Sequence, residues 1–153
     1  MKGAAKKERS VLQTAIWFLS RREYSQHELR RKLAERDFSE EQIEHALGRL
    51  VEEDLQSDER FAKCAIRSRA SAGRGPRRIQ AELAQHALQD GSARDLLEEE
   101  QIDWDANARA LVARRYGEGC LDFNTRRKAM NFLLGRGFSM ETARLATNPQ
   151  AES

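Results

Sequence analysis

The sequence has few of the residues that break helices, cross membranes or form disulfides. Only two of its 153 residues are proline, Pro76 and Pro149, so long segments run without a helix breaker. The longest apolar run covers residues 15–19, whereas a membrane-spanning helix needs about 20 apolar residues. The two cysteines, Cys64 and Cys120, lack the spacing of a metal site, and we interpret them as reduced thiols. We therefore expect a cytoplasmic protein without a membrane segment.

The composition is typical of a folded chain. Hydrophobic residues make up 39% and charged residues 34%, which is too apolar for a disordered protein and too charged for a membrane protein. Lysines near the N-terminus precede a moderately apolar stretch, but Gln13 and Thr14 interrupt it and no small-residue cleavage site follows. We interpret residues 1–9 as a basic tail in front of an amphipathic helix.

A repeat of 50 residues organises the chain. The segments 36–39 (Arg-Asp-Phe-Ser) and 136–139 (Arg-Gly-Phe-Ser) lie 100 residues apart, and half of that offset places Leu88 at the position of the two phenylalanines. Such self-similarity at a fixed spacing indicates tandem structural units. The same register aligns Leu33 with Leu83 and Leu133, and it aligns Ser25 with Gly75 and Thr125, all three being residue types that favour a helix N-cap.

Each repeat reads as three amphipathic helices. In the first repeat, Leu12, Ala15, Ile16 and Leu19 follow the apolar period of one helix face. Two pairs, Ser25 with Glu28 and Ser39 with Gln42, have the spacing of capping boxes that start the second and third helices. No segment alternates as a strand does. We predict an all-α fold of three tandem three-helix repeats, elongated and able to curve, with repeats at 10–55, 56–101 and 102–148 and tails at 1–9 and 149–153.

Charge is unevenly distributed, although the net charge is only +2. Residues 2–36 carry ten Lys or Arg against four acids, and residues 37–59 carry nine acids against one base. A basic segment at 60–94, an acidic one at 95–106 and a basic one at 107–145 follow. This pattern predicts a repeated basic surface that meets an acidic partner. The alternative is a set of solvated faces whose charges pair within the molecule.

Clusters of basic residues are the candidates for contacts with such a partner. We place them near the starts of the second helices, where bases oppose the helix dipole, so that local helix stability does not explain them. The moderate net charge argues against tight DNA binding by this chain alone. The clusters are Arg30, Arg31 and Lys32; Arg77 and Arg78; and Arg126, Arg127 and Lys128.

No pattern in the sequence predicts catalysis. The histidines His27, His45 and His86 are scattered, one to a helix, and the acidic runs lack the spacing of a calcium loop. The glycine-rich turn before Pro76 lacks the Gly-Lys-Ser/Thr signature of a phosphate-binding loop. We expect no enzyme activity, no catalytic residue, no metal and no cofactor.

The aromatic residues of the first helices have two readings. Trp17, Phe18 and Trp104 have apolar neighbours in the sequence. Exposed aromatic rings can serve as platforms on which nucleic-acid bases stack. We interpret all three as core residues, because helical apolar stripes more commonly face the interior.

Two linked segments resemble the RecX family of regulatory proteins, small bacterial modulators of the RecA recombinase. The first is Asp-Glu-Arg-Phe-Ala at 58–62, and the second is Gly-x-Gly-Pro-x-x-Ile-x-x-Glu-Leu at 73–83. The similarity extends over about residues 10–145. Within and beside the matching segments, we add Arg67, Arg69, Arg74 and Arg136 to the expected contact residues.

The resemblance implies a negative regulator that binds the RecA filament, with single-stranded DNA as a further partner. Proteins of this family lodge in the filament groove, block filament extension and suppress ATP hydrolysis, strand exchange and co-protease activity. These activities belong to recombination, DNA repair and the SOS response. A monomer with three repeats could span neighbouring filament subunits, so that weak contacts add up to tight binding.

Two other functions fit parts of the sequence. A helix-turn-helix-like DNA-binding regulator would also use three-helix units. Its recognition helices would be the third helices, which are acidic in repeats 1 and 2 and would be repelled by DNA phosphates. The remaining hypothesis is a helical scaffold that binds some other acidic protein.

Overall fold

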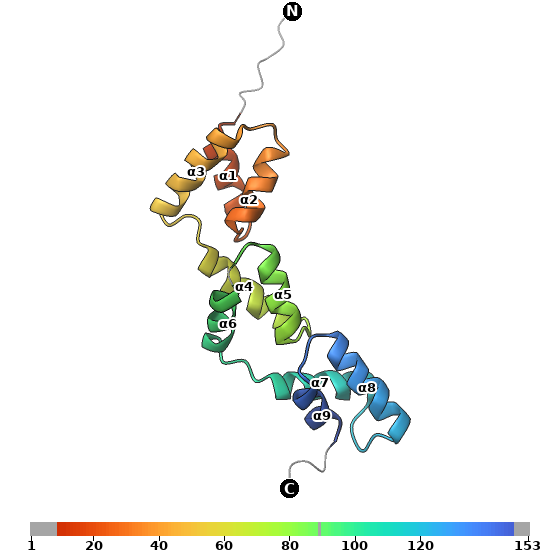
Figure 1. Cartoon of the computed structure of the whole chain (residues 1–153). Coiled ribbons are helices and arrows are strands. Elements are labelled where there is room, and N and C mark those ends of the chain that lie inside the picture. The colour runs from red at the N-terminus through yellow and green to blue at the C-terminus, as the bar shows by residue number, and fades with distance from the viewer. Residues whose placement is uncertain (1–8, 89, 149–153) are drawn as a thin grey trace, which may run out of the picture. The chain divides into compact units, whose positions relative to one another are not determined.

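Helices make up all the regular secondary structure of the computed structural model, which describes residues 9–88 and 90–148 (Figure 1). The predicted all-α fold is confirmed for these residues, and none of their helices has the length and apolar character needed to span a membrane. Apart from Arg9, the predicted tails at 1–9 and 149–153 lie outside the described residues. The nine helices are α1 (Val11–Leu19), α2 (Gln26–Ala34), α3 (Glu40–Glu52), α4 (Asp58–Ser71), α5 (Pro76–Gln85), α6 (Asp90–Glu99), α7 (Trp104–Tyr116), α8 (Phe123–Gly135) and α9 (Met140–Thr147).

Contacts along the chain define two compact units. The first ends at Ala62 and the second begins at Lys63, so the division falls inside α4. The first unit holds α1 to α3 and the start of α4, and the second holds the rest of α4 and α5 to α9. Residues 56–62 of predicted repeat 2 therefore belong to the first unit, and the rest of repeat 2 shares the second unit with repeat 3.

The first unit packs its three complete helices around one apolar core. Phe18 of α1 lies against Tyr24, with 5.5 Å between the ring centroids. Ile16, which we predicted to face the core, is 41% exposed, whereas Phe18, which we also interpreted as a core residue, is buried. The reason is that the buried stripe of α1 runs through Thr14, Ala15 and Phe18, so that it is rotated from the predicted face. The other buried residues of the cluster are Leu29, Leu33, Ile43, Leu47 and Leu50.

The second unit has a core built from small and large apolar side chains. Around α7 to α9, Phe138 is almost completely buried and its ring lies 6.4 Å from that of the half-buried Trp104. Leu83 and Leu133, which the repeat aligns, are both fully or almost fully buried. Other buried residues of this unit are Ile66, Ala70, Ile79, Ala93, Leu96, Leu97, Ala108, Val112, Ala129 and Ala143.

Side-chain caps define where several helices begin. Ser39 and Gln42 form the predicted capping box, and Ser25 accepts a hydrogen bond of 3.1 Å from the Glu28 backbone N–H. Thr125, however, is not an N-cap, because α8 begins three residues earlier than its repeat equivalents. Asp122 is the cap of α8 and accepts a 2.7 Å bond from the Thr125 N–H, a bond that also lowers the pKa of the Asp122 carboxyl.

The 50-residue repeat is visible in the backbone. Asp37, Ala87 and Gly137 lie 50 residues apart, and their φ angles are 66°, 60° and 97°. Each residue follows the end of the second helix of its repeat and reverses the chain in the left-handed conformation. The register found in the sequence therefore has a structural counterpart at the same turn in every repeat.

Replacing Ala87 by glycine should stabilise the protein. An L-residue in the left-handed region costs about 1–2 kcal/mol, and the greater freedom of glycine in the unfolded chain offsets part of the gain. We expect a net increase of about 0.5–1 kcal/mol in the free energy of unfolding, measured by urea titration. Ala81→Gly, in the middle of α5, is the matched control and should lower stability by about 1 kcal/mol. A loss of stability in Ala87→Gly would contradict the prediction.

Candidate functional site

The predicted basic clusters do not occupy equivalent places on their helices. Because Ser25 caps α2, the cluster from Arg30 to Lys32 lies in the second half of that helix and not at its start. Bases near a helix C-terminus complement the helix dipole, so local helix stability explains part of this cluster after all. Arg77 and Arg78 do lie in the first turn of α5, whereas the cluster from Arg126 to Lys128 begins in the first turn of α8 and reaches the second.

Arg30 links two helices of the first unit. Its guanidinium donates to both carboxylate oxygens of Glu44 on α3, at 2.6 and 3.3 Å, and to the Gln26 side chain at 3.2 Å. The hydrogen bond from Arg30 lowers the pKa of the exposed Glu44 carboxyl. Arg31 is exposed and Lys32 is half-buried. In this cluster, Arg30 is therefore occupied within the protein, and Arg31 is the more available cation.

In the second unit, one carboxylate holds three of the predicted arginines. Glu82 of α5 bonds to Arg69 of α4 at 3.0 Å and to Arg74 of the α4–α5 turn at 2.5 Å. Arg78, one helical turn before Glu82, lies 3.9 Å from the same carboxylate. We call these four residues the Glu82 cluster. Three guanidinium groups around one carboxylate leave two uncompensated positive charges and several N–H donors, which suits the binding of an oxyanion.

The start of α5 is fastened to the α8–α9 turn through backbone atoms (Figure 1). The Gly75 N–H donates to the Arg136 carbonyl at 2.8 Å, and the Arg77 N–H donates to the Gly137 carbonyl at 3.0 Å. A Cβ atom on Gly75 would collide with the backbone of Gly137 and Phe138, and one on Gly137 would collide with Arg78. The contact joins the positive end of α5 to the negative end of α8 and thereby places Arg136 beside Arg77.

A further ion pair lines a hollow in the second unit. Arg67 of α4 binds both oxygens of Glu100 at 2.7 and 3.1 Å, and this hydrogen bond lowers the pKa of the Glu100 carboxyl. The hollow, of about 390 Å³, continues along α7 past Leu111 to Arg114. Its lining includes the apolar side chains of Ile102 and Leu111 and both arginines. Arg67 therefore holds the segment after α6 in place, and it also adds a positive charge to the hollow.

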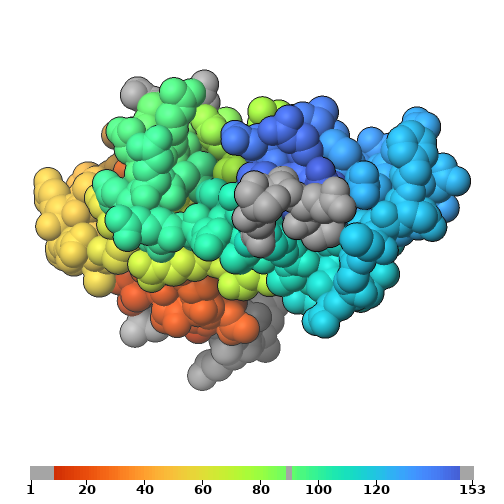
Figure 2. Space-filling model, turned by 90° about the horizontal axis from the view of Figure 1, so that it is seen from below, coloured from red at the N-terminus to blue at the C-terminus, as the bar shows by residue number. Residues whose placement is uncertain are grey.

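The outer face of α8 carries two exposed cations. Arg127 and Lys128 are exposed and form no ion pair with any residue from 9–88 or 90–148. They border a shallow hollow together with Asn124 and Asn131, and Figure 2 shows this helix, in light blue, at the surface. Arg126 differs, since it is half-buried and its guanidinium donates to the Leu121 carbonyl at 3.5 Å.

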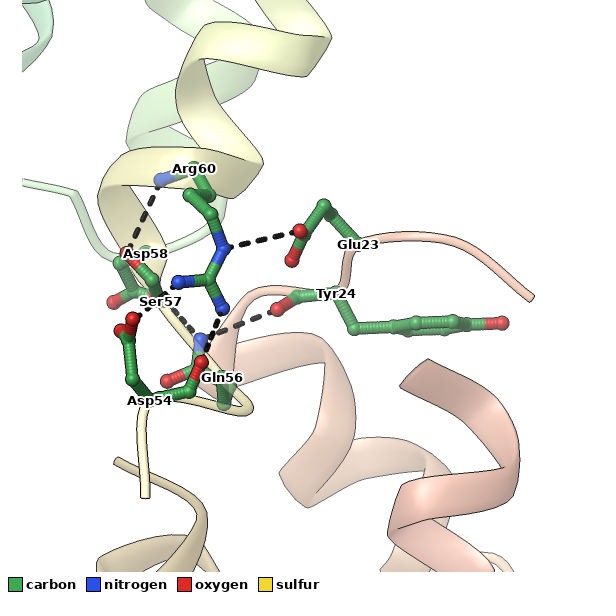
Figure 3. A network of polar contacts seen from close by, with 7 residues as sticks. All are labelled: Glu23, Tyr24, Asp54, Gln56, Ser57, Asp58 and Arg60. Atoms are coloured by element: carbon green, nitrogen blue, oxygen red, sulfur yellow. Dashed lines mark hydrogen bonds and ion pairs between the residues drawn. The ribbon is translucent and has the colours of Figure 1, made fainter. Parts of the chain in front are cut away.

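The segment 58–62 forms a polar network that sequence reasoning did not identify (Figure 3). Arg60 donates to Glu23 at 3.1 Å and to the side chain and carbonyl of Asp54 at 2.9 and 2.8 Å. The buried Gln56 donates to the Tyr24 carbonyl at 3.2 Å. These bonds tie the α1–α2 loop to the start of α4, so the role of this segment is structural. The spacing of Asp54 and Arg60 could have suggested a local ion pair, but nothing in the sequence indicated Glu23.

The chemistry of these surfaces is that of binding. Guanidinium groups form paired hydrogen bonds with phosphates and carboxylates. Across residues 9–88 and 90–148, no three His, Cys, Asp or Glu side chains gather as metal ligands. Cys64 and Cys120 are free and exposed.

Comparison with known proteins matches each predicted repeat to a family domain. Residues 12–50, 57–96 and 103–146 match the descriptions "RecX, first three-helix domain", "RecX, second three-helix domain" and "RecX, third three-helix domain". The regulatory protein RecX of Xanthomonas oryzae pv. oryzae (strain MAFF 311018) is 42% identical over 147 residues, which are 95% of this chain and 92% of that protein. The regulatory protein RecX of Stenotrophomonas maltophilia (strain K279a) is 41% identical over 142 residues, 92% of this chain and 87% of the relative.

Solved structures agree with these matches. The crystal structure of RecX from Lactobacillus salivarius superimposes with a TM-score of 0.75 at 25% identity, covering 89% of this chain and 91% of that one. A second crystal structure, of a regulatory protein RecX, has a TM-score of 0.74 at 23% identity, covers 89% of this chain and 69% of the other, and supports the fold. The family domains span all three repeats, and the relatives match almost from end to end. The chain therefore belongs to the RecX family of regulatory proteins.

Proposed function

We propose that this protein is a negative regulator of the RecA recombinase that binds the RecA filament on single-stranded DNA. It blocks filament extension and thereby lowers the ATPase, strand-exchange and co-protease activities of RecA in recombination, repair and the SOS response. The observation that carries the proposal is the match of all three repeats to the domains of RecX regulatory proteins. The protein acts in the cytoplasm, as a monomer and without a catalytic step.

The surface of the second unit supports this proposal. Its arginines surround a single carboxylate in the Glu82 cluster, and the outer face of α8 adds Arg127 and Lys128. Arg136 lies over the Phe132 ring at 5.2 Å, and its turn is fixed to the start of α5. Cations held on a rigid scaffold bind an anionic surface with less loss of side-chain freedom than mobile cations do.

Assembly of RecA filaments on single-stranded DNA, with and without this protein, tests the function directly. We expect a substoichiometric amount to lower the DNA-dependent ATPase and strand exchange of RecA, because one bound molecule stops the growth of a whole filament. Unchanged ATPase and strand exchange at every ratio of the two proteins would refute the proposal.

Charge reversal on α8 should weaken inhibition without unfolding the protein. The double variant Arg127→Glu, Lys128→Glu replaces two exposed cations and leaves the half-buried Arg126 in place. We expect the concentration for half-inhibition of the RecA ATPase to rise roughly tenfold or more, because like charges then face each other across the interface. Circular dichroism should show unchanged helicity.

A control variant with the same change in net charge tests whether the position of the reversed charges matters. Arg94→Glu with Arg144→Glu alters exposed residues of α6 and α9 that are outside the proposed contacts. This control should inhibit RecA almost as well as the parent protein. Equal inhibition by both double variants would move the contact surface away from α8.

A sequence-specific DNA reader is the competing function. Its recognition helices would be the third helices of the repeats, and α3 presents the exposed acids Glu40, Glu41 and Glu44. Carboxylates on a helix are repelled by the phosphates that line a DNA groove. Footprinting that protected one defined duplex site would favour this function over filament binding.

A further inference from the structure

Three arginines from separate segments of the first unit converge on one indole ring. Arg9 precedes α1, Arg21 follows α1 and Arg36 follows α2. Their guanidinium carbons lie over the ring of Trp17, at 5.8, 5.1 and 5.8 Å from its centroid. Arg36 also lies 5.2 Å from the centroid of Phe18. We call Trp17 and the three arginines the Trp17 cluster, and none of its members was among the predicted contact residues.

No carboxylate is paired with this cluster among the described residues. Arg22, Arg30 and Arg60 of the same unit each bind a carboxylate, whereas the arginines of the Trp17 cluster form no ion pair there. The negative face of the indole and the C-terminal ends of α1 and α2 attract cations and hold them in place. These partial charges do not balance three full positive charges, and no carboxylate among residues 9–88 and 90–148 pairs with them.

The surroundings of the cluster favour a nucleic acid over an acidic peptide. The three arginines are exposed and Trp17 is half-buried, so a cationic surface adjoins a partly accessible indole ring. Sites for single-stranded nucleic acids combine a positive surface with aromatic side chains that contact bases, whereas an acidic peptide would use the charge alone. A single strand also carries closely spaced phosphates, so that neighbouring phosphates can bind different arginines.

We propose that the Trp17 cluster binds the phosphate backbone of single-stranded DNA, with the indole of Trp17 beside a base. The biological role of this contact rests on the proposed function, because the RecA filament is assembled on such a strand. The contact itself is a property of the full chain and is measured without RecA. If the protein inhibits the filament but does not bind DNA, this inference alone is overturned. If it binds DNA through the cluster but does not inhibit the filament, the proposed function alone is overturned.

Binding of a fluorescein-labelled oligothymidylate, followed by anisotropy over a series of salt concentrations, tests the proposal. For single strands each phosphate contact contributes about 0.7 to the slope of log affinity against log salt concentration. The double variant Arg21→Gln, Arg36→Gln should therefore reduce the slope by about 1.4 and weaken binding roughly 25-fold at 0.1 M salt. In a Trp104→Phe background, the oligonucleotide should quench the fluorescence of Trp17.

Matched variants distinguish the effect of losing this site from the effects of changed net charge and of unfolding. Arg49→Gln removes an exposed arginine of the same unit that is paired with Glu53, and it should leave the slope unchanged. Arg21→Lys with Arg36→Lys keeps both charges and should retain most of the slope. Parental affinity and slope in the double glutamine variant, with helicity preserved, would overturn the proposal. So would equally tight, cluster-dependent binding of polyglutamate, which would assign the cluster to an acidic protein.

Discussion

Gly137→Ala is expected to lower the stability of the second unit by about 3 kcal/mol or more. The left-handed φ of 97° costs an alanine about 1–2 kcal/mol, and the new Cβ would collide with the backbone of Arg78. Relieving that collision separates α5 from the α8–α9 turn and weakens two hydrogen bonds, each of which contributes about 1 kcal/mol. Trp104, which packs near Phe138, reports on this unit in a Trp17→Phe background during urea unfolding.

Two other glycines provide the comparison. Gly75→Ala meets the same backbone contact from the opposite side but has an ordinary φ of −83°, so it should destabilise the unit less than Gly137→Ala does. Gly48 lies inside α3, where an added Cβ would have no neighbouring atom within 4 Å, and Gly48→Ala should raise stability by up to about 1 kcal/mol. If Gly137→Ala were as stable as the parent, the backbone contact would not hold α5 to the turn.

Glu82→Gln is expected to cost about 1–2 kcal/mol of stability and to make that stability depend on oxyanions. Glu82 is 28% exposed and neutralises part of the charge of Arg69, Arg74 and Arg78. Without it, three guanidinium groups are left together without a carboxylate partner, an arrangement that is costly when partly buried. Sulfate can bridge guanidinium groups, so it should stabilise the variant more than it stabilises the parent protein.

The measurement compares the unfolding midpoint in sodium sulfate and in sodium chloride of equal ionic strength. Sulfate stabilises most proteins to some degree, so the relevant quantity is the difference between variant and parent in the sulfate-induced shift of the midpoint. Glu53→Gln removes an exposed carboxylate paired with Arg49 at 3.4 Å, and it should change stability by less than about 0.5 kcal/mol. The same sulfate effect in Glu82→Gln and in the parent would contradict an oxyanion site at the Glu82 cluster.

Each of the two segments that carry the family resemblance holds parts of its unit together. The segment 58–62 supplies Arg60, which ties the start of α4 to Glu23 and Asp54. The segment 73–83 supplies Gly75, which allows close backbone contact, and Glu82, which gathers three arginines. Both segments therefore fix the geometry of the surfaces that depend on them.

Errors in the sequence predictions came from positions where several local choices were equally good. Ile16 and Phe18 are both apolar residues of α1 that we predicted to be buried, and packing against α2 and α3 buried only Phe18. Aspartate and threonine both favour the N-cap position, and in α8 Asp122 is the cap in place of the predicted Thr125. The same uncertainty in helix starts misplaced the cluster from Arg30 to Lys32 on its helix. A shift of a few residues changes which face and which end of a helix a charge occupies.

By itself, the sequence determined the helical repeats, their register and three of their N-caps, namely Ser25, Ser39 and Gly75. These features depend on apolar periodicity and on bonds between residues three or four positions apart, which are encoded locally. Only the tertiary structure decided which arginines pair with a carboxylate and which do not. Glu82 of α5 binds Arg69 of α4, and Gly75 contacts Gly137 of another repeat. Arg9, Arg21 and Arg36 come together at the ring of Trp17. Charge pairing depends on distances in space, and a linear pattern does not specify those distances.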